Sequence, residues 1–129
     1  KELDGYNAAR RSAADYYDNA FSSCDKIITP VRASYSTHVF HQYTMRVVGV
    51  DRNALQAFLS EHKVPAMIYY PVPLHQQKAY KDNRYNDGDF PISEMLIKEV
   101  ISLPMHTELT EEQLQFITSK VLEFVNKNK

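Results

Sequence analysis

The sequence predicts an α+β domain in which helices cover a small mixed β-sheet, with a long helix at the amino terminus. Two observations carry this prediction: segments with the two-residue period of strands alternate with segments of helical period, and the helical pattern begins within three residues of the start. The 129 residues are 43% hydrophobic and 24% charged, which suits one core. We expect one domain over residues 1–129, with residues 1–21 as a connecting helix and 35–129 as the α+β part.

The first helix has apolar residues at helical spacing, at Leu3, Tyr6, Ala9, Ala13, Tyr17 and Ala20. No Ser, Thr, Asp or Asn precedes it as an N-cap, and Lys1 is not a methionine. We therefore interpret Lys1 as lying inside a helix that continues upstream and packs against a preceding domain. A complete protein with a frayed first turn is the alternative. We expect the helix to end near Phe21, before an irregular or extended connection that includes Pro30.

The middle of the chain predicts two strands around one helix. Over residues 39–48 one face is formed by every second residue, Val39, His41, Tyr43, Met45 and Val47. Asp51 is predicted to cap a helix that ends at Val64 and Pro65. A short strand over residues 66–70 should follow. Pro71 and Pro73 then remove donors from the ladder, so the chain must leave the sheet there.

The last third predicts a loop, two helices and a strand. Residues 80–89 are polar and should form a surface loop, after which Pro91 suits the first turn of a helix. Ile92, Met95, Leu96 and Val100 share one side of that helix. A third strand is expected over residues 101–103. Thr110 and Gln113 form a capping box for the last helix, whose buried stripe is predicted to be Leu114, Ile117, Val121, Leu122 and Val125.

Charge and cysteine content exclude several function classes. A formal net charge of -1 provides no positive field for nucleic acid or for an anionic membrane surface. The single cysteine, Cys24, cannot form an internal disulfide, and no Cys-x-x-Cys pair is present. No signal peptide or spanning segment is recognisable, so we expect a cytoplasmic protein. His38 and His41 would lie on opposite strand faces and no third ligand is evident, so we expect no metal site.

Five segments, in order, resemble the DegT/DnrJ/EryC1/StrS group of sugar aminotransferases, which are fold type I enzymes dependent on pyridoxal 5'-phosphate (PLP). One is Tyr70-Pro71-Val72-Pro73-Leu74-His75. The others are Leu3 to Arg11, His41 to Val47, Gly88 to Pro91, and Ser102 to His106 with the following Glu108 to Gln113. The resemblance covers nearly the whole chain. It implies that the chain is the C-terminal small domain of a larger aminotransferase.

The resemblance also implies what this chain does not contain. The family's Schiff-base lysine and the sheet and loops that hold PLP belong to a large N-terminal domain, and no lysine of this sequence has a recognisable PLP setting. We therefore expect this chain alone to bind no PLP, to have no catalytic residue of its own and to be inactive. The full-length enzyme is expected to be a homodimer that uses glutamate to aminate a nucleotide-linked keto-sugar, by resemblance a UDP-keto-hexose or hexuronic acid.

By the same resemblance, the substrate-binding candidates are Tyr69, Tyr70, His75 and His41. Residues 68–71 match a segment at the mouth of the family's active site, where Tyr69 replaces a histidine that is commoner in the family. A phenol still bonds a sugar hydroxyl but is a poor proton shuttle near neutral pH. The alternatives are a ring that fills the sheet face for Tyr69 or Tyr70, which should point opposite ways on a strand, a surface-loop His75, and a hydrogen-bonded His41 within the domain.

Two rival functions remain open. A free-standing module that binds a small molecule has the same expected architecture, and an inactive relative could serve only in assembly. A domain separated from its partner should expose the apolar side of Leu3, Tyr6 and Tyr17, or the edge formed by residues 69–75. A module should have neither patch.

Overall fold

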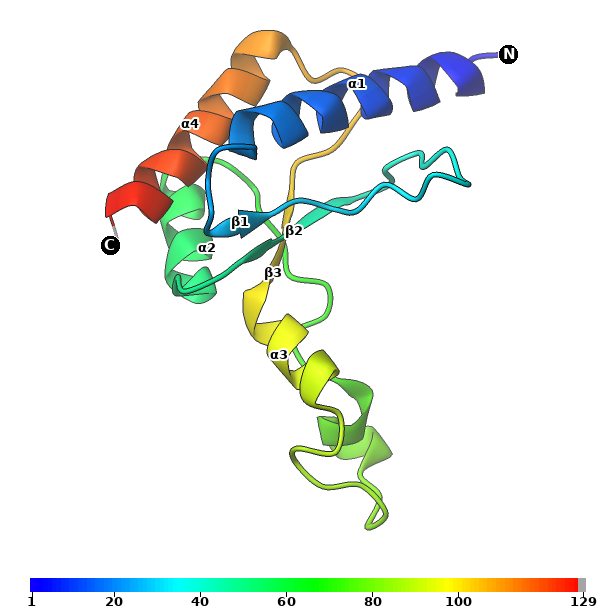
Figure 1. Ribbon diagram of the computed structural model, residues 1–129, viewed down its shortest axis with the longest axis vertical. Helices are drawn as coiled ribbons and strands as arrows, with labels where there is room; N and C mark the ends of the chain where they lie inside the picture. Colours follow the sequence, from blue (N-terminus) through cyan, green and yellow to red (C-terminus); the bar gives the residue numbers. More distant parts are fainter. Residues whose placement is uncertain (128–129) are drawn as a thin grey trace.

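The computed structural model describes residues 1–127 and confirms helices on a small sheet (Figure 1). The last two residues of the predicted domain, Asn128 and Lys129, lie outside this description. In chain order the elements are α1 (Leu3–Phe21), β1 (Ile27–Ile28), β2 (Tyr43–Val47), α2 (Arg52–Glu61), the 3-10 turns η1 (Leu74–Gln76) and η2 (Lys78–Tyr80), α3 (Pro91–Glu99), β3 (Val100–Leu103) and α4 (Glu111–Lys127).

The sheet is antiparallel, so the predicted mixed sheet is wrong for the described residues. Its order is β1-β2-β3, with Ile27 opposite Val47 and Tyr43 opposite Leu103. Met67 adds a single antiparallel bridge to Ser102 on the other side of β3. The Met67 segment therefore runs in the same direction as β2, but β3 lies between them. Every hydrogen-bonded pair of neighbouring segments in the described sheet is therefore antiparallel.

The strands are shorter than the alternation predicts, because the backbone turns at their ends. Phe40 has a φ of +48°, in the left-handed region, so the backbone cannot be an extended strand at this residue. Its ring is buried. The predicted face consequently begins only at Tyr43, while Val39 and His41 are exposed. Residues 66–70 likewise form one bridge instead of a strand. The two-residue β1 lies in the segment expected to be irregular or extended.

The core lies where α1, α2 and α4 pack together over the sheet. The predicted helix caps are confirmed: Asp51 accepts from the amides of Asn53 and Ala54, and Thr110 exchanges hydrogen bonds with Gln113. The predicted stripe of α4 is also confirmed. Four of its residues are buried and Leu122 packs against the core from a partly buried position, the four being Leu114, Ile117, Val121 and Val125.

Residues 68–99, which we call the arm, project from this body away from α1 and α4 (Figure 1). None of the residues of η1, η2 or α3 is buried. The stripe predicted for α3 is therefore not a core face: Ile92 is 69% exposed and Met95 39%. Leu96 and Val100 are half-buried instead and face the rest of the arm.

Two arginines of the body hold the root of the arm. Arg52, at the start of α2, donates to Val100 O at 2.6 Å and to Ile97 O at 2.8 Å. Arg46 on β2 donates to the Glu99 carboxylate at 2.7 and 2.8 Å. Polar contacts thus fix the carboxyl end of α3, a helix none of whose residues is buried.

Candidate functional site

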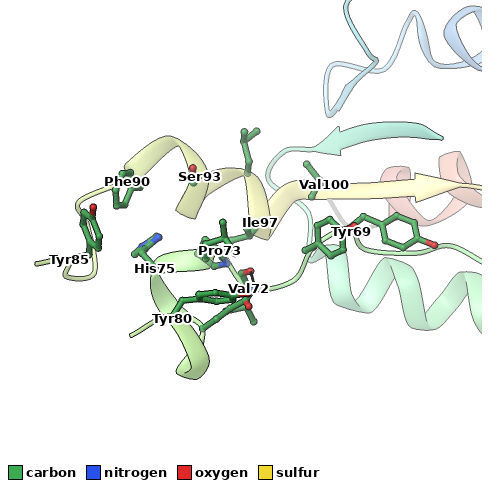
Figure 2. A pocket seen from close by; sticks show the side chains of 14 residues that line it. Tyr69, Val72, Pro73, His75, Tyr80, Tyr85, Phe90, Ser93, Ile97 and Val100 are labelled. Carbon is green, nitrogen blue, oxygen red and sulfur yellow. Dashed lines mark hydrogen bonds between the residues drawn. The ribbon is translucent and has the colours of Figure 1, made fainter. Parts of the chain in front are cut away.

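The arm folds back on itself around an open groove of about 1040 Å³, which we call the arm groove (Figure 2). Figure 2 shows α3 on one side and the two 3-10 turns on the other. Its lining is rich in aromatic side chains, namely Tyr69, Tyr70, Tyr80, Tyr85 and Phe90, with His75 among them. None of the lining residues is Asp, Glu, Lys or Arg. The groove therefore offers flat apolar faces and neutral hydrogen-bonding groups.

Local sequence explains why the chain bends around the groove. After the Met67 bridge, Pro71 and Pro73 cannot donate to a ladder, so the chain leaves the sheet as predicted. Pro73 is extended and directly precedes η1. At the other side Pro91 occupies the first turn of α3, as predicted, where its missing donor costs nothing.

The structure brings three of the four predicted site residues together. Tyr69, Tyr70 and His75 all line the arm groove, with the Tyr69 and Tyr70 rings 6.0 Å apart. The expectation that the two tyrosines point to opposite sides is wrong, because this segment has already left the strand. Tyr70 is 75% exposed and Tyr69 39%, so neither fills a sheet face.

His75 is held by an acidic residue that the sequence did not single out. Its Nε2 lies 3.0 Å from Glu94 Oε1, and the Gly88 amide donates to both oxygens of the same carboxylate at 2.8 and 3.0 Å. The Gly88 amide, with His75 adding to it, holds the pKa of Glu94 below its usual range against the opposing effect of desolvation. Glu94 is therefore an anion that accepts from both neighbours.

His41, the fourth predicted residue, lies elsewhere. It lines a smaller groove of about 340 Å³ beside the turn before β2, with His38 and Gln42. Arg32 stabilises that turn: it bonds Asp15 at 2.6 Å and Asp18 at 2.7 Å, and its guanidinium lies 4.8 Å from the centre of the Phe40 ring. His41 is exposed and does not line the arm groove.

Sequence reasoning missed Glu94, Tyr85 and Phe90 as parts of the site. Phe90 belongs to the Gly88 to Pro91 segment of the family resemblance, and Glu94 is an acid in the first turn of α3, so each carried only a local signal. The partner of Glu94, His75, is 19 residues away in the sequence. A loop of undefined shape separates the two, so their contact could not be read from spacing.

Neither groove has a lining that fits PLP by itself. The cofactor needs a lysine to anchor it and an acidic partner for its ring nitrogen. No lysine or carboxylate lines either groove. Within residues 1–127 no three His, Cys, Asp or Glu side chains are grouped to hold a metal ion, and no helix is long and apolar enough to cross a membrane.

Comparison with known proteins places these features in a family context. The family model of the DegT/DnrJ/EryC1/StrS aminotransferases matches residues 1–122. A pleiotropic regulatory protein of Geobacillus stearothermophilus is 41% identical over 95% of the chain and 33% of its own length. A dTDP-3-amino-3,6-dideoxy-α-D-galactopyranose transaminase of Aneurinibacillus thermoaerophilus is 36% identical over 97% of the chain and 32% of its length.

Two further known proteins match a similar share of the chain. A UDP-N-acetyl-3-dehydro-α-D-glucosamine 3-aminotransferase of Acidithiobacillus ferrooxidans is 36% identical over 92% of the chain and 31% of its length. The crystal structure of Streptomyces venezuelae DesV with a ketimine intermediate is 28% identical, with a TM-score of 0.89 over 96% of the chain and 33% of its own. The chain thus spans about a third of the proteins it matches.

Proposed function

Because this chain belongs to the DegT/DnrJ/EryC1/StrS aminotransferase family, we propose that it is the C-terminal domain of a PLP-dependent aminotransferase acting on a nucleotide-linked keto-sugar. One observation carries the proposal: the family match extends over residues 1–122, yet the chain spans only about a third of its relatives. When bound, PLP supplies the electron sink for amino transfer. The lysine that holds it would come from a domain preceding Lys1.

The arm groove is proposed to form part of the substrate mouth. Tyr69 and Tyr70 would contact the substrate by stacking and through their hydroxyl groups, which donate to and accept from sugar hydroxyls. His75 would contact it through the part of the ring that Glu94 leaves free. His41 would approach from the smaller groove. A groove without charged residues suits the uncharged parts of such a substrate.

The finer features of the proposal come from resemblance. We propose glutamate as amino donor, a UDP-linked keto-hexose or hexuronic acid as substrate, a cytoplasmic homodimer, and a domain that is inactive alone. The relative that acts on a UDP-sugar supports the nucleotide, while an equally similar relative is named for a dTDP-sugar. Aminotransferase assays with a UDP-linked and a dTDP-linked keto-sugar decide between the two nucleotides.

The surface favours a domain separated from its partner over a free-standing module. Leu3 is 67% exposed and Tyr6 50%, and the arm groove leaves Tyr70 and Leu74 open to solvent. Such patches are typical of surfaces that another protein segment covers. The expectation that Tyr17 belongs to the exposed side is wrong, because its ring is fully buried in the core.

Incubation of the purified chain with PLP and borohydride is expected to label either no lysine or several lysines substoichiometrically. No lysine lines either groove, so neither groove would favour an imine at one lysine over the others. Peptide mapping by mass spectrometry measures the result. Stoichiometric labelling of one lysine would show that this chain holds the cofactor, and the proposal would be wrong.

In a protein that joins this chain to a PLP-binding domain, Tyr70→Ala is expected to raise KM for the keto-sugar by about tenfold, the value of one good ring contact. The change in kcat should be smaller. Steady-state kinetics measure both constants. Tyr35→Ala is the matched control, because Tyr35 is 92% exposed and lines neither groove. Equal effects of the two substitutions would contradict a substrate contact at Tyr70.

A further inference from the structure

The carboxylate of Glu94 joins three segments of the arm. Glu94 lies in the first turn of α3, His75 in η1, and Gly88 in the loop between η2 and α3. His75 Nε2 is 3.0 Å from Oε1, and the Gly88 amide is 2.8 Å from Oε1 and 3.0 Å from Oε2. Because a carboxylate only accepts, His75 donates through a proton on Nε2. A single anion thus binds two donors that are distant in sequence from each other.

Burial and backbone geometry make this contact more than a surface ion pair. The side chain of His75 is 8% exposed and that of Glu94 18%. Gly88 has a φ of +94°, a backbone conformation that other residues rarely adopt, so a glycine allows its amide to meet the carboxylate. Charge-assisted hydrogen bonds that are shielded from water are stronger than neutral or exposed ones.

The contact controls one wall of the arm groove. The His75 ring lies 4.8 Å from the Phe90 ring, and Phe90 lies 5.5 Å from Tyr85, measured between ring centres. All three rings line the groove, whereas Glu94 does not. Figure 2 shows His75 between the η1 side and Phe90. No residue of η1, η2 or α3 is buried, so these rings lack the support of a closed hydrophobic core of their own.

We propose that Glu94 is a positioning residue of the site: it holds His75 and the loop at Gly88 so that His75, Phe90 and Tyr85 form a fixed aromatic wall. Its value to catalysis rests on the proposed function, because the wall belongs to the groove in which we place the substrate. A second hydrogen bond, from Gln76 to Asp87 at 2.9 Å, joins η1 to the same loop but is exposed. Water competes for it, so we expect it to contribute little.

Glu94→Ala is expected to loosen the wall in this chain. Amide exchange at Gly88 should become at least about tenfold faster, and nuclear Overhauser contacts between the His75 and Phe90 rings should weaken. Nuclear magnetic resonance measures both. Glu61→Ala is the matched control, since Glu61 is exposed at the end of α2, away from the arm. Gln76→Ala should change the same signals much less.

Glu94→Gln and Glu94→Ala together provide a spectroscopic signature that a general loss of stability would not produce. A glutamine oxygen at the position of Oε1 can still accept from both the Gly88 amide and the proton on His75 Nε2. The ring proton of His75 should therefore stay on Nε2 in Glu94→Gln, whereas Glu94→Ala should release it to a mixture of the two tautomers, which ¹⁵N spectra of the imidazole report directly. The wall should remain in place in Glu94→Gln. An unchanged tautomer together with normal Gly88 exchange in Glu94→Ala would overturn the proposal.

Kinetics separate this proposal from the proposed function. In the protein joined to a PLP-binding domain, Glu94→Ala should raise KM for the keto-sugar about tenfold, with kcat changed less than threefold, and Glu94→Gln should restore most of the affinity. An unchanged KM in a variant with a loosened wall would overturn the positioning role. Absence of aminotransferase activity in the unsubstituted joined protein would instead contradict the proposed function, and the spectra would still decide whether Glu94 holds the wall.

Discussion

Tyr17→Ala is expected to lower the free energy of unfolding by about 3–5 kcal/mol, as large-to-small substitutions of buried aromatic residues do. Tyr17 is 0% exposed, and its ring lies 4.8 Å from the Tyr43 ring and is stacked on Phe21 at 6.2 Å. Its hydroxyl donates to Pro104 O at 2.8 Å, which connects α1 to the chain just after β3. Alanine would leave a cavity and an unpaired carbonyl. Chemical denaturation of this chain measures the loss.

Two further variants separate the contributions at Tyr17. Tyr17→Phe removes only the hydroxyl and should cost about 1–2 kcal/mol. Tyr6→Ala, on the same helix but at a half-exposed position, should change stability by less than about 0.5 kcal/mol. If Tyr17→Ala cost no more than Tyr6→Ala, α1 would not be part of this core.

Arg52→Leu is expected to cost about 2–4 kcal/mol and to loosen the arm. Arg52 is 7% exposed and donates to Val100 O and Ile97 O, so its loss leaves two carbonyl groups at the root of the arm without their donor. Deuterium exchange of residues 68–99 should increase together with the loss of stability. Denaturation and exchange measured by mass spectrometry test the two effects in one sample.

The control for Arg52 is Arg84, an arginine of the arm itself. Arg84 pairs with Asp82, but its side chain is 76% exposed, so Arg84→Leu should cost less than about 0.5 kcal/mol. Arg52→Lys keeps the charge but not the fork of donors and should lie between the two. Faster exchange confined to α2 after Arg52→Leu, with the arm unchanged, would show that Arg52 does not hold the arm.

Most of the secondary structure could be predicted from interactions between residues close together in the sequence. The caps at Asp51 and Thr110, Pro91 in the first turn of α3 and the stripe of α4 depend on residues within about one or two helical turns of each other. For the same reason, the departure of the chain from the sheet after Met67 was predictable from Pro71 and Pro73. The length of β2 was not, because the turn at Phe40 depends on a buried ring that no local pattern marks.

The candidate site was predicted only in part. Tyr69, Tyr70 and His75 were identified by resemblance, and the structure places them on one groove, whereas His41 lines another. Glu94 escaped notice because an acid in the first turn of a helix is an ordinary stabilising feature. Its contact with His75 exists only once the loop between η2 and α3 is folded.

By itself, then, the sequence determined the helices, their caps, the family resemblance and the residues from which the groove is built. Only the tertiary structure decided that the sheet is antiparallel, that Tyr17 faces the core and not the outside, and that no residue of α3 is buried. The physical reason is the range of the forces involved. Capping and periodicity act between near neighbours in the chain, while strand order, burial and the contacts of Arg52 and Glu94 depend on residues that meet only after folding.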